Sequence, residues 1–160
     1  MDVSGINSGP LRSQDHSPFH LPRSMAFHVH VDTQWRVGVI RFMGCVAGSE
    51  VIRAISTMLD HPDWEPGYCR LTDSAGVSVM DVTPDDLERM VLQEHAEYER
   101  MGPGRKAMVV PERLLDIAEV YRQSIQRGPH PYELELFTDE AEAWRWLCGP
   151  CVDDAALTRL

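Results

Sequence analysis

The sequence predicts a single α/β domain whose elements follow in the order ββαβαβαβα and form a mixed, mostly parallel sheet covered by helices. The length of 160 residues is that of one domain. Short apolar, β-branched segments alternate with longer segments of helical periodicity, which indicates parallel strands joined by crossover helices. The first two strand segments follow each other directly, and this hairpin makes the sheet mixed.

The first half of the chain predicts a hairpin, a helix and a further strand. Their ranges are 26–33 and 35–44 for the hairpin strands, 47–62 for the segment that contains the helix, and 67–73 for the next strand. Ser49 is a candidate N-cap of this helix, and Pro62 ends the segment. Residues 74–83 are expected to form a loop with at most a fragment of strand, because small residues interrupt the pattern.

The second half predicts helices with clear start and stop residues. The expected elements are a helix at 84–101, a strand at 105–110, a helix at 111–128, a strand at 132–138 and a helix at 139–148. Thr83 is a capping residue and Pro84 suits the first helical position. Gly102 and Gly128 are the expected stops, and Thr138 is the expected cap of the last helix.

The two ends of the chain lack a periodic pattern. Residues 1–24 are rich in Ser, Pro, Gly and His and have no continuous apolar run, so we expect a disordered leader and no secretory signal. The domain is then expected at 25–148, followed by a tail at 149–160. No apolar run approaches the roughly 20 residues of a membrane span, and the four cysteines do not suggest a secreted disulfide framework. A cytoplasmic location is therefore predicted.

Charge and composition exclude several classes of partner. The formal net charge is −10, which argues against binding to nucleic acid or to an anionic membrane surface. No Gly-rich phosphate loop follows a strand, and no cofactor is predicted. The acidic residues of helix 84–101, such as Glu94, Glu97 and Glu99, are expected on its solvated exterior.

A metal site is not predicted either. His28, His30 and Asp32 alternate on one face of the first strand, and two imidazoles with a carboxylate could bind a metal ion. A polar face on an edge strand has the same pattern. No second cluster at ligand spacing accompanies these residues, so we interpret them as a solvated strand face.

The string CGPC at 148–151 has the spelling of a thioredoxin-type dithiol. Such enzymes place the dithiol after a strand, at a helix N-terminus that stabilises the thiolate. Here it follows a helix, in which Ala141, Trp144 and Cys148 share a face, and Gly-Pro is a common helix stop. Cys148 is therefore predicted to be a small core residue. Because a short helix could begin near Cys151, a dithiol oxidoreductase that uses Cys148 and Cys151 stays an alternative.

Four strings together resemble the SpoIIAA-like family of small STAS-type domains: HPDWEPGYCRLTD, MDVTPDDLERM, RKAMVVPERLLDIAEVYRQ and LELFTDEAEAWRWL. The resemblance covers about residues 25–148, and its most specific piece is F-x-D-E-x-E-A-x-x-W-L near the end. The family is similar in fold to anti-sigma-factor antagonists and to Sec14-type lipid-binding domains. The resemblance implies a mixed βα sandwich, no agreed enzymatic activity, and a regulatory or binding role.

Anti-sigma-factor antagonists carry a phosphorylatable Ser in a D-S-x-G motif at a helix N-terminus. This chain has DSAG at 73–76, but the helix start is marked only at Thr83, so Asp81 is the matching Asp and Val82 occupies the Ser position. Phosphorylation of Ser74 or Thr83 remains a hypothesis. The resemblance implies a partner surface on loop 74–83 and the start of helix 84–101. Its candidate residues are Ser74, Asp81, Thr83 and Asp85.

Three functions follow from these observations. The first is a non-enzymatic regulatory or protein-interaction module of STAS type, with a regulatory protein or a second copy of the chain as partner. The second is a carrier of a small apolar molecule or lipid. Four methionines could line its pocket, although filling of the core is the favoured interpretation for them: Met80, Met90, Met101 and Met108. The third is the dithiol oxidoreductase.

Overall fold

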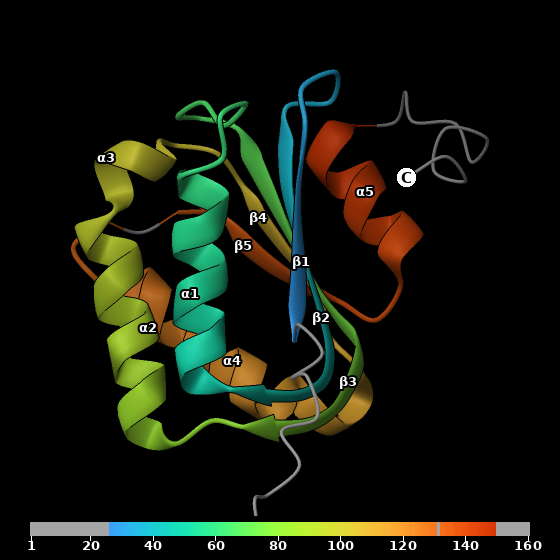
Figure 1. The fold of residues 1–160 in the computed structure, drawn as a ribbon, viewed down its shortest axis with the longest axis vertical. Helices are drawn as coiled ribbons and strands as arrows, with labels where there is room; N and C mark the ends of the chain where they lie inside the picture. Colours follow the sequence, from blue (N-terminus) through green and yellow to red (C-terminus); the bar gives the residue numbers. More distant parts are fainter. Residues whose placement is uncertain (1–25, 131, 150–160) are drawn as a thin grey trace, which may run out of the picture.

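The computed structural model describes residues 26–130 and 132–149. Its centre is a five-stranded sheet whose spatial order is the chain order, β1-β2-β3-β4-β5 (Figure 1). The strands are β1 Phe27–Asp32, β2 Val37–Ala47, β3 Cys69–Asp81, β4 Lys106–Val109 and β5 Leu134–Phe137. β1 pairs with β2 antiparallel and the other neighbours pair parallel, which confirms the predicted mixed, mostly parallel α/β sheet.

Helices cover both faces of this sheet (Figure 1). They are α1 Gly48–Leu59, α2 Pro84–Ala96, α3 Tyr98–Met101, α4 Leu115–Arg127 and α5 Glu140–Cys148, with a 3₁₀ turn at Glu112–Leu114 before α4. α1, α2 and α4 lie on one side and α5 lies alone on the other. None of the described helices is long and apolar enough to span a membrane. The expected leader at 1–24, the tail from residue 150 and Cys151 lie outside the described residues.

The prediction of a loop at 74–83 is wrong, because β3 continues to Asp81. Its second half pairs with the second half of β2, from Met43↔Gly76 to Ala47↔Asp81. Two register shifts, between Arg41 and Met43 and between Gly44 and Cys45, bend this extension. Small residues such as Gly76 look like a turn in the sequence, but a side chain there would press on the Phe42 carbonyl, at 3.1 Å from a Cβ.

The starts of α1, α2 and α5 were predicted within two residues, but not always with the right cap. α1 begins at Gly48, before Ser49, and the Glu50 carboxylate accepts a hydrogen bond from the Ala47 N–H at 2.9 Å. α5 is capped by Asp139 and not by Thr138: the Asp139 carboxylate accepts from the N–H of Glu142 at 2.9 Å. In both cases a carboxylate near the first turn satisfies an N–H better than the predicted hydroxyl does.

The two other predicted helices also differ in detail. The single helix expected at 84–101 is divided into α2 and α3 around Glu97. Turning the chain here lets the carbonyl of Arg100 accept a hydrogen bond from the Trp64 indole at 3.0 Å. The helix expected from Pro111 starts with the 3₁₀ turn, and it ends before Gly128 as predicted.

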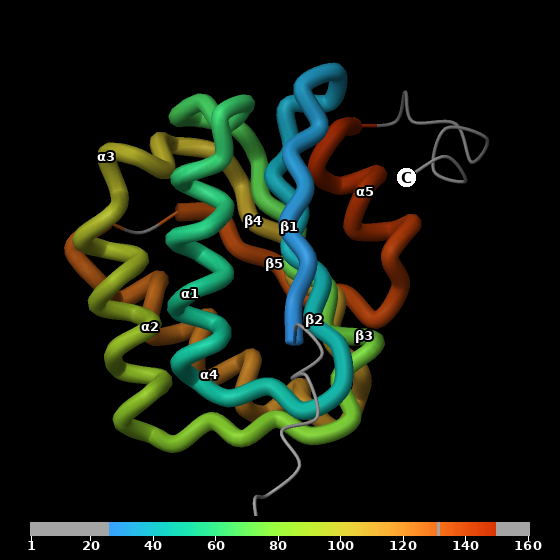
Figure 2. Tube along the Cα trace, in the orientation of Figure 1, coloured from blue at the N-terminus to red at the C-terminus, as the bar shows by residue number. Residues whose placement is uncertain are grey.

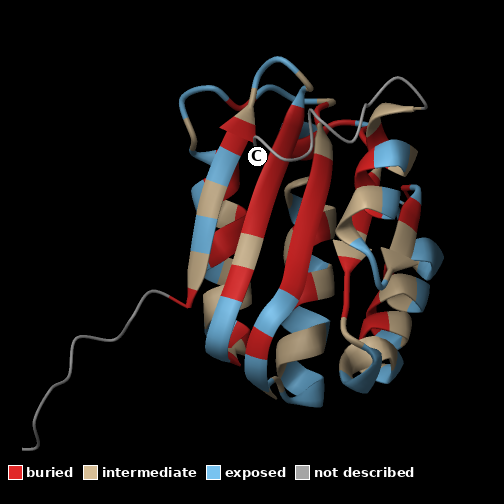
Figure 3. Ribbon diagram, turned by 90° about the vertical axis from the view of Figure 1, so that its right-hand side faces the viewer, coloured by how far each residue is buried: buried red, intermediate tan, exposed pale blue. Residues whose placement is uncertain are grey.

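Apolar cores lie on both faces of the sheet. The core between the sheet and α1 includes Phe42, Ile55 and Trp64. The core under α5 is built around Trp144, which is 2% exposed. Figure 3 shows the central strands mostly buried, while the edge strand β1 alternates between exposed and intermediate residues.

Candidate functional site

A cluster of charged side chains lies buried between the sheet and helices α2 and α4. Arg70 on β3 and Lys106 on β4 are register partners in adjacent parallel strands, so their side chains leave the same face of the sheet side by side. Glu94 on α2 lies opposite them. The three side chains are 2 to 6% exposed, which is unusual for ionised groups unless they are paired.

Glu94 is the centre of this cluster and accepts four hydrogen bonds. Its Oε1 accepts from Lys106 Nζ at 2.5 Å and from the Tyr121 hydroxyl at 2.6 Å. Its Oε2 accepts from Arg70 Nη1 at 3.2 Å and from the Tyr132 hydroxyl at 2.5 Å. The Arg70 guanidinium also stacks over the Tyr132 ring at 4.2 Å. A carboxylate with four donors is a fully satisfied buried anion.

The environment of this cluster shifts the pKa values of its members. Burial alone would raise the pKa of Glu94, but the charges of Lys106 and Arg70 and the hydrogen bonds from Lys106 and Tyr121 lower it to about 2. Burial lowers the pKa of Lys106 below its usual range, against the attraction of Glu94. The pKa of Tyr121 is well above its usual value because the phenol is buried beside Glu94. Glu94 is therefore ionised and the phenols are neutral donors near neutral pH.

An apolar pocket opens directly beside this cluster. It has a cavity volume of about 80 Å³ and lies between β2, β3 and β4 on one side and α1, α2 and α4 on the other. Helices α1 and α2 begin at the lower end of the molecule, where β2 and β3 finish (Figure 2). The pocket extends from this end, where Val51 and Leu87 line it in the first turns of α1 and α2, to Lys106 at the start of β4.

The lining of the pocket combines adaptable apolar side chains with a few polar groups. Met80, Met90 and Met108 contribute to it, whereas Met101 is buried against the Arg70 guanidinium, with its sulfur 2.7 Å from Nη1. Methionine side chains rearrange easily and suit a pocket that adapts to its contents. The polar groups come from Lys106 and Tyr121 of the charged cluster and from the hydroxyls of Thr72 and Ser74.

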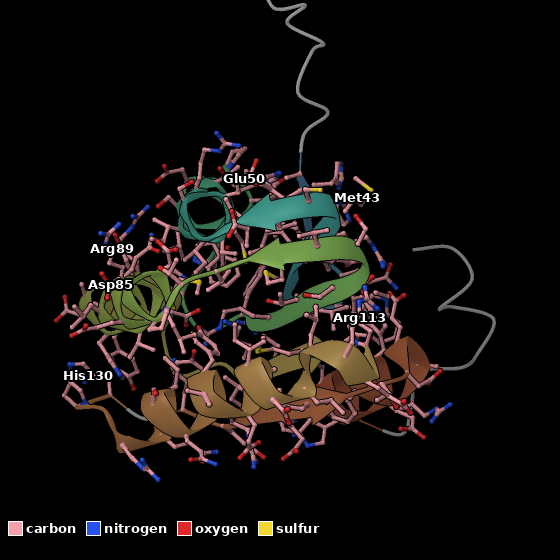
Figure 4. All side chains as sticks on the ribbon, turned by 90° about the horizontal axis from the view of Figure 1, so that it is seen from below. Met43, Glu50, Asp85, Arg89, Arg113 and His130 are labelled. Carbon is pink, nitrogen blue, oxygen red and sulfur yellow. The ribbon has the colours of Figure 1, made fainter. Side chains whose placement is uncertain are left out.

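The extension of β3 and the start of α2 form one side of this region. Arg113, in the 3₁₀ turn before α4, donates a hydrogen bond to the carbonyl of Val77 in the extension of β3 (Figure 4). Val82 and Leu87, on either side of the start of α2, line the pocket from within. The residues that flank the start of α2 therefore also form part of the pocket wall.

The four residues predicted for a partner surface do not lie together. Ser74 is 5% exposed and lines the pocket with Thr72. Asp81, Thr83 and Asp85 are exposed, around the end of β3 and the start of α2, and Figure 4 shows Asp85 on the outer side of this helix. Seven residues of extended strand separate Ser74 from Asp81, about 23 Å at the rise of a β-strand.

Local capping and pairing account for two of the motifs in this region. The Thr83 hydroxyl accepts from the N–H of Asp86 at 3.2 Å, and the Asp86 carboxylate accepts from the N–H of Thr83 at 3.1 Å. The two hydrogen bonds form a capping box, in which Thr83 is the capping residue, as predicted. In the DSAG string, the Asp73 carboxylate forms an ion pair with Arg41 at 2.6 Å and accepts from the N–H of Ala75 at 2.9 Å. Asp73 therefore stabilises the bend of β3.

Cys148 is the last residue of α5 and packs partly against the core below it. The surroundings of this thiol disfavour the thiolate, which is the nucleophilic form of cysteine. Burial, and then the proximity of Cys69 and Asp32, raise the pKa of Cys148 from 9.0 to about 11. Gly149 ends the helix with a φ of 81°, as the helix-stop interpretation predicted. Cys151 lies outside the described residues.

Alkylation of Cys148 is expected to be slow. With a pKa of about 11, its thiolate fraction at pH 8 is roughly 100-fold lower than that of a thiol at 9.0. A time course with iodoacetamide, followed by peptide mass spectrometry, measures this rate. The exposed Cys45 of the same chain is the internal control. Equal rates for Cys148 and Cys45 would contradict the assignment and favour a reactive dithiol.

The polar residues of β1 lie apart from this region. His28 and His30 are exposed on the edge strand, as the solvated-face interpretation expected. Among residues 26–130 and 132–149, no group of three or more His, Cys, Asp or Glu side chains is placed to hold a metal ion.

Comparisons with known proteins bear on the fold. No protein-family model matches the sequence, and no curated protein is similar to it in sequence. An uncharacterised protein of the DUF3478 family from Shewanella loihica PV-4, which has a SpoIIAA-like fold, superposes with a TM-score of 0.52 at 14% identity, over 77% of this chain and 93% of that one. The fold of this chain is SpoIIAA-like. The unphosphorylated anti-sigma factor antagonist SpoIIAA superposes with a TM-score of 0.42 at 21% identity, over 73% and 94% of the two chains.

The buried cluster of this SpoIIAA-like domain was missed by the sequence analysis. Glu94 was expected on the exterior of its helix, and it is 2% exposed. One signal could have found it: Leu87, Glu94 and Met101 are spaced by seven residues, which places Glu94 within the apolar stripe. A carboxylate within an apolar stripe needs buried cations, and Arg70 and Lys106 supply them.

Proposed function

We propose that this protein is a non-enzymatic binding module of regulatory type, which holds a small, mainly apolar molecule in the pocket between its sheet and helices α1, α2 and α4. The pocket is the observation that carries the proposal. It is lined mostly by apolar side chains, with a few polar groups gathered around Lys106. Ligand sites of proteins have this composition.

The size of the pocket limits its ligand. A cavity of about 150 Å³ holds benzene in an engineered core. The cavity here is about 80 Å³, so an occupant is a small molecule or displaces side chains as it enters. Met80, Met90 and Met108 are the side chains most able to move, because methionine has several rotatable bonds and no branch.

Filling the pocket from within is expected to abolish binding. Ala118 on α4 is 5% exposed and lines the cavity, so Ala118→Leu places a larger side chain where the ligand would lie. We expect hexan-1-ol to bind the wild-type protein, as measured by isothermal titration calorimetry, and to bind Ala118→Leu at least tenfold more weakly. A tenfold loss of affinity corresponds to about 1.4 kcal/mol of binding free energy.

A matched control lies on the same helix. Val120 is 52% exposed, so Val120→Leu adds apolar volume to the outer surface of α4 and leaves the pocket unchanged. Circular dichroism and thermal unfolding establish that both variants are folded. Equal binding to Ala118→Leu and Val120→Leu, or no binding to the wild type, would contradict the proposal.

A protein partner at the start of α2 is the second candidate, and one observation favours it. The exposed residues Asp81, Thr83 and Asp85 flank Val82 and Leu87, whose side chains line the pocket. A ligand that moves these two side chains would alter the exposed surface above them. The partner is therefore expected to distinguish the filled from the empty pocket, which is a regulatory role.

Affinity capture tests this second candidate. Asp85→Lys reverses a charge on the candidate surface, and Glu119→Lys does the same on α4 as a control. A protein retained by the wild type and by Glu119→Lys, and lost with Asp85→Lys, would support the surface. Identical captured proteins for all three would contradict it.

A further inference from the structure

The charges around the pocket do not balance. The buried cluster contains two cations, Arg70 and Lys106, and one carboxylate, Glu94. The phenols of Tyr121 and Tyr132 are neutral, because burial beside Glu94 raises both pKa values well above the usual range. A formal excess of one positive charge is therefore buried at this point, and a buried charge is costly unless it is paired.

Two donor groups of the cluster have spare capacity. The Lys106 ammonium has three N–H groups, and two of them donate, to Glu94 at 2.5 Å and to the Tyr121 hydroxyl at 3.0 Å. The Nε of Arg70 is buried and has no hydrogen-bond partner among the described residues. Of these two residues, Lys106 lines the pocket, and its third N–H is therefore the donor that a ligand can reach.

Two further polar groups line the pocket from the sheet: Thr72, two residues along β3 from the register partner of Lys106, and Ser74, two residues further on. Thr72 precedes Ser74 by two residues on β3, so both face the pocket, and Thr72 is the register partner of Met108, two residues after Lys106 on β4. Their hydroxyls can donate to an anion. The remainder of the lining is apolar, as it is for Ile40, Ile55 and Met90.

We propose that the ligand of this pocket is a small apolar acid, whose carboxylate is bound by Lys106 and the hydroxyl of Thr72 while its hydrocarbon part fills the cavity. This inference rests on the proposed function. A carboxylate neutralises the excess positive charge and takes up the third N–H of Lys106. An alcohol would satisfy the donor and leave the charge unpaired, and an ammonium would add a further positive charge.

Three probes with the same hydrocarbon part test the charge requirement. Hexanoate, hexan-1-ol and hexylamine are titrated into the full-length protein at pH 7 by isothermal titration calorimetry. We expect hexanoate to bind about tenfold or more tightly than hexan-1-ol, and hexylamine to bind more weakly than both, since a charge-assisted hydrogen bond is about twice as strong as a neutral one. Equal or tighter binding of hexan-1-ol would overturn the inference.

Two tyrosines provide a matched pair of variants. Tyr121→Phe and Tyr132→Phe each remove one phenol that donates to Glu94, but only Tyr121 lines the pocket and contacts Lys106. We expect Tyr121→Phe to change hexanoate affinity at least about fivefold, and Tyr132→Phe to leave it within about twofold. Equal changes of hexanoate affinity in both variants would show that the two phenols affect binding only through the stability of the fold. That outcome would contradict a role of Tyr121 at the ligand.

Removing the charge itself is the most direct test. Lys106→Met is expected to abolish the preference for hexanoate over hexan-1-ol while hexan-1-ol still binds. If this variant does not fold, Thr72→Val keeps the shape and removes one proposed donor, and we expect the preference to fall about threefold or more. An unchanged preference in the folded variant overturns the inference. Absence of binding by all three probes overturns the proposed function as well, so the two failures are distinguishable.

Discussion

Replacing Glu94 by glutamine is expected to lower the free energy of unfolding by about 3–5 kcal/mol. The amide has nearly the same shape, but its single oxygen can accept from only one of the two phenols, because Tyr121 donates to Oε1 and Tyr132 to Oε2. It also carries no charge, so Arg70 and Lys106 remain as two buried cations without an anion. Removing one partner of a buried ion pair costs far more than the net value of the pair, because the remaining charges stay desolvated.

Urea unfolding followed by circular dichroism measures this effect. Glu88→Gln, on the exposed side of the same helix, is the control and is expected to change stability by less than about 0.5 kcal/mol. A loss below about 1 kcal/mol in Glu94→Gln would show that the cluster is hydrated or that Lys106 is neutral in the folded protein.

Glu94 also predicts a dependence of stability on pH. Its pKa in the folded protein is about 2, against an ordinary value of 4.5. For a carboxyl group with a lowered pKa, the stabilisation is fully present above 4.5 and is lost as the pH falls towards 2. The difference between these two pKa values corresponds to about 3 kcal/mol in the free energy of unfolding. We expect the stability of the wild type to fall more steeply than that of Glu94→Gln between pH 5 and pH 2, and parallel curves would contradict this.

Gly102→Ala is expected to cost at least about 3 kcal/mol of stability. Gly102 follows α3 with φ 72° and ψ −173°, a conformation that is essentially restricted to glycine. A Cβ at this position would lie 2.3 Å from the backbone nitrogen of Gly67, whose N–H donates to Met101 at 2.7 Å. The clash is with backbone atoms, so no side-chain rotation relieves it.

Gly149→Ala separates the two causes of this cost. Gly149 has nearly the same conformation, with φ 81° and ψ −179°, but no described atom lies within 4 Å of its Cβ position. It therefore carries the conformational cost without the clash, about 1 kcal/mol. Thermal unfolding of both variants measures the difference. Equal costs would show that the loop at Gly67 moves away without penalty.

Sequence patterns predict those features of the fold that depend on residues close together in the chain. Alternating strands and helices, the capping residue Thr83 and the helix stops at Gly102 and Gly128 depend on neighbours within one or two turns, so the order of elements and the α/β class followed from the sequence. The loop predicted at 74–83 failed because a strand exists only with its partner. The partner of this segment is the end of β2, about thirty residues earlier in the chain.

The candidate site depended entirely on the tertiary structure. Arg70, Glu94, Lys106, Tyr121 and Tyr132 lie far apart in the sequence, and none of them was predicted as a site residue. The register of β3 and β4 places the two cations side by side, and the packing of α2 and α4 brings the carboxylate and the phenols to them. The sequence by itself determined the order of strands and helices and most of their ends, because those preferences are local. Only the folded chain decided that Glu94 is buried and that a pocket lies beside Lys106, because both result from contacts between distant segments.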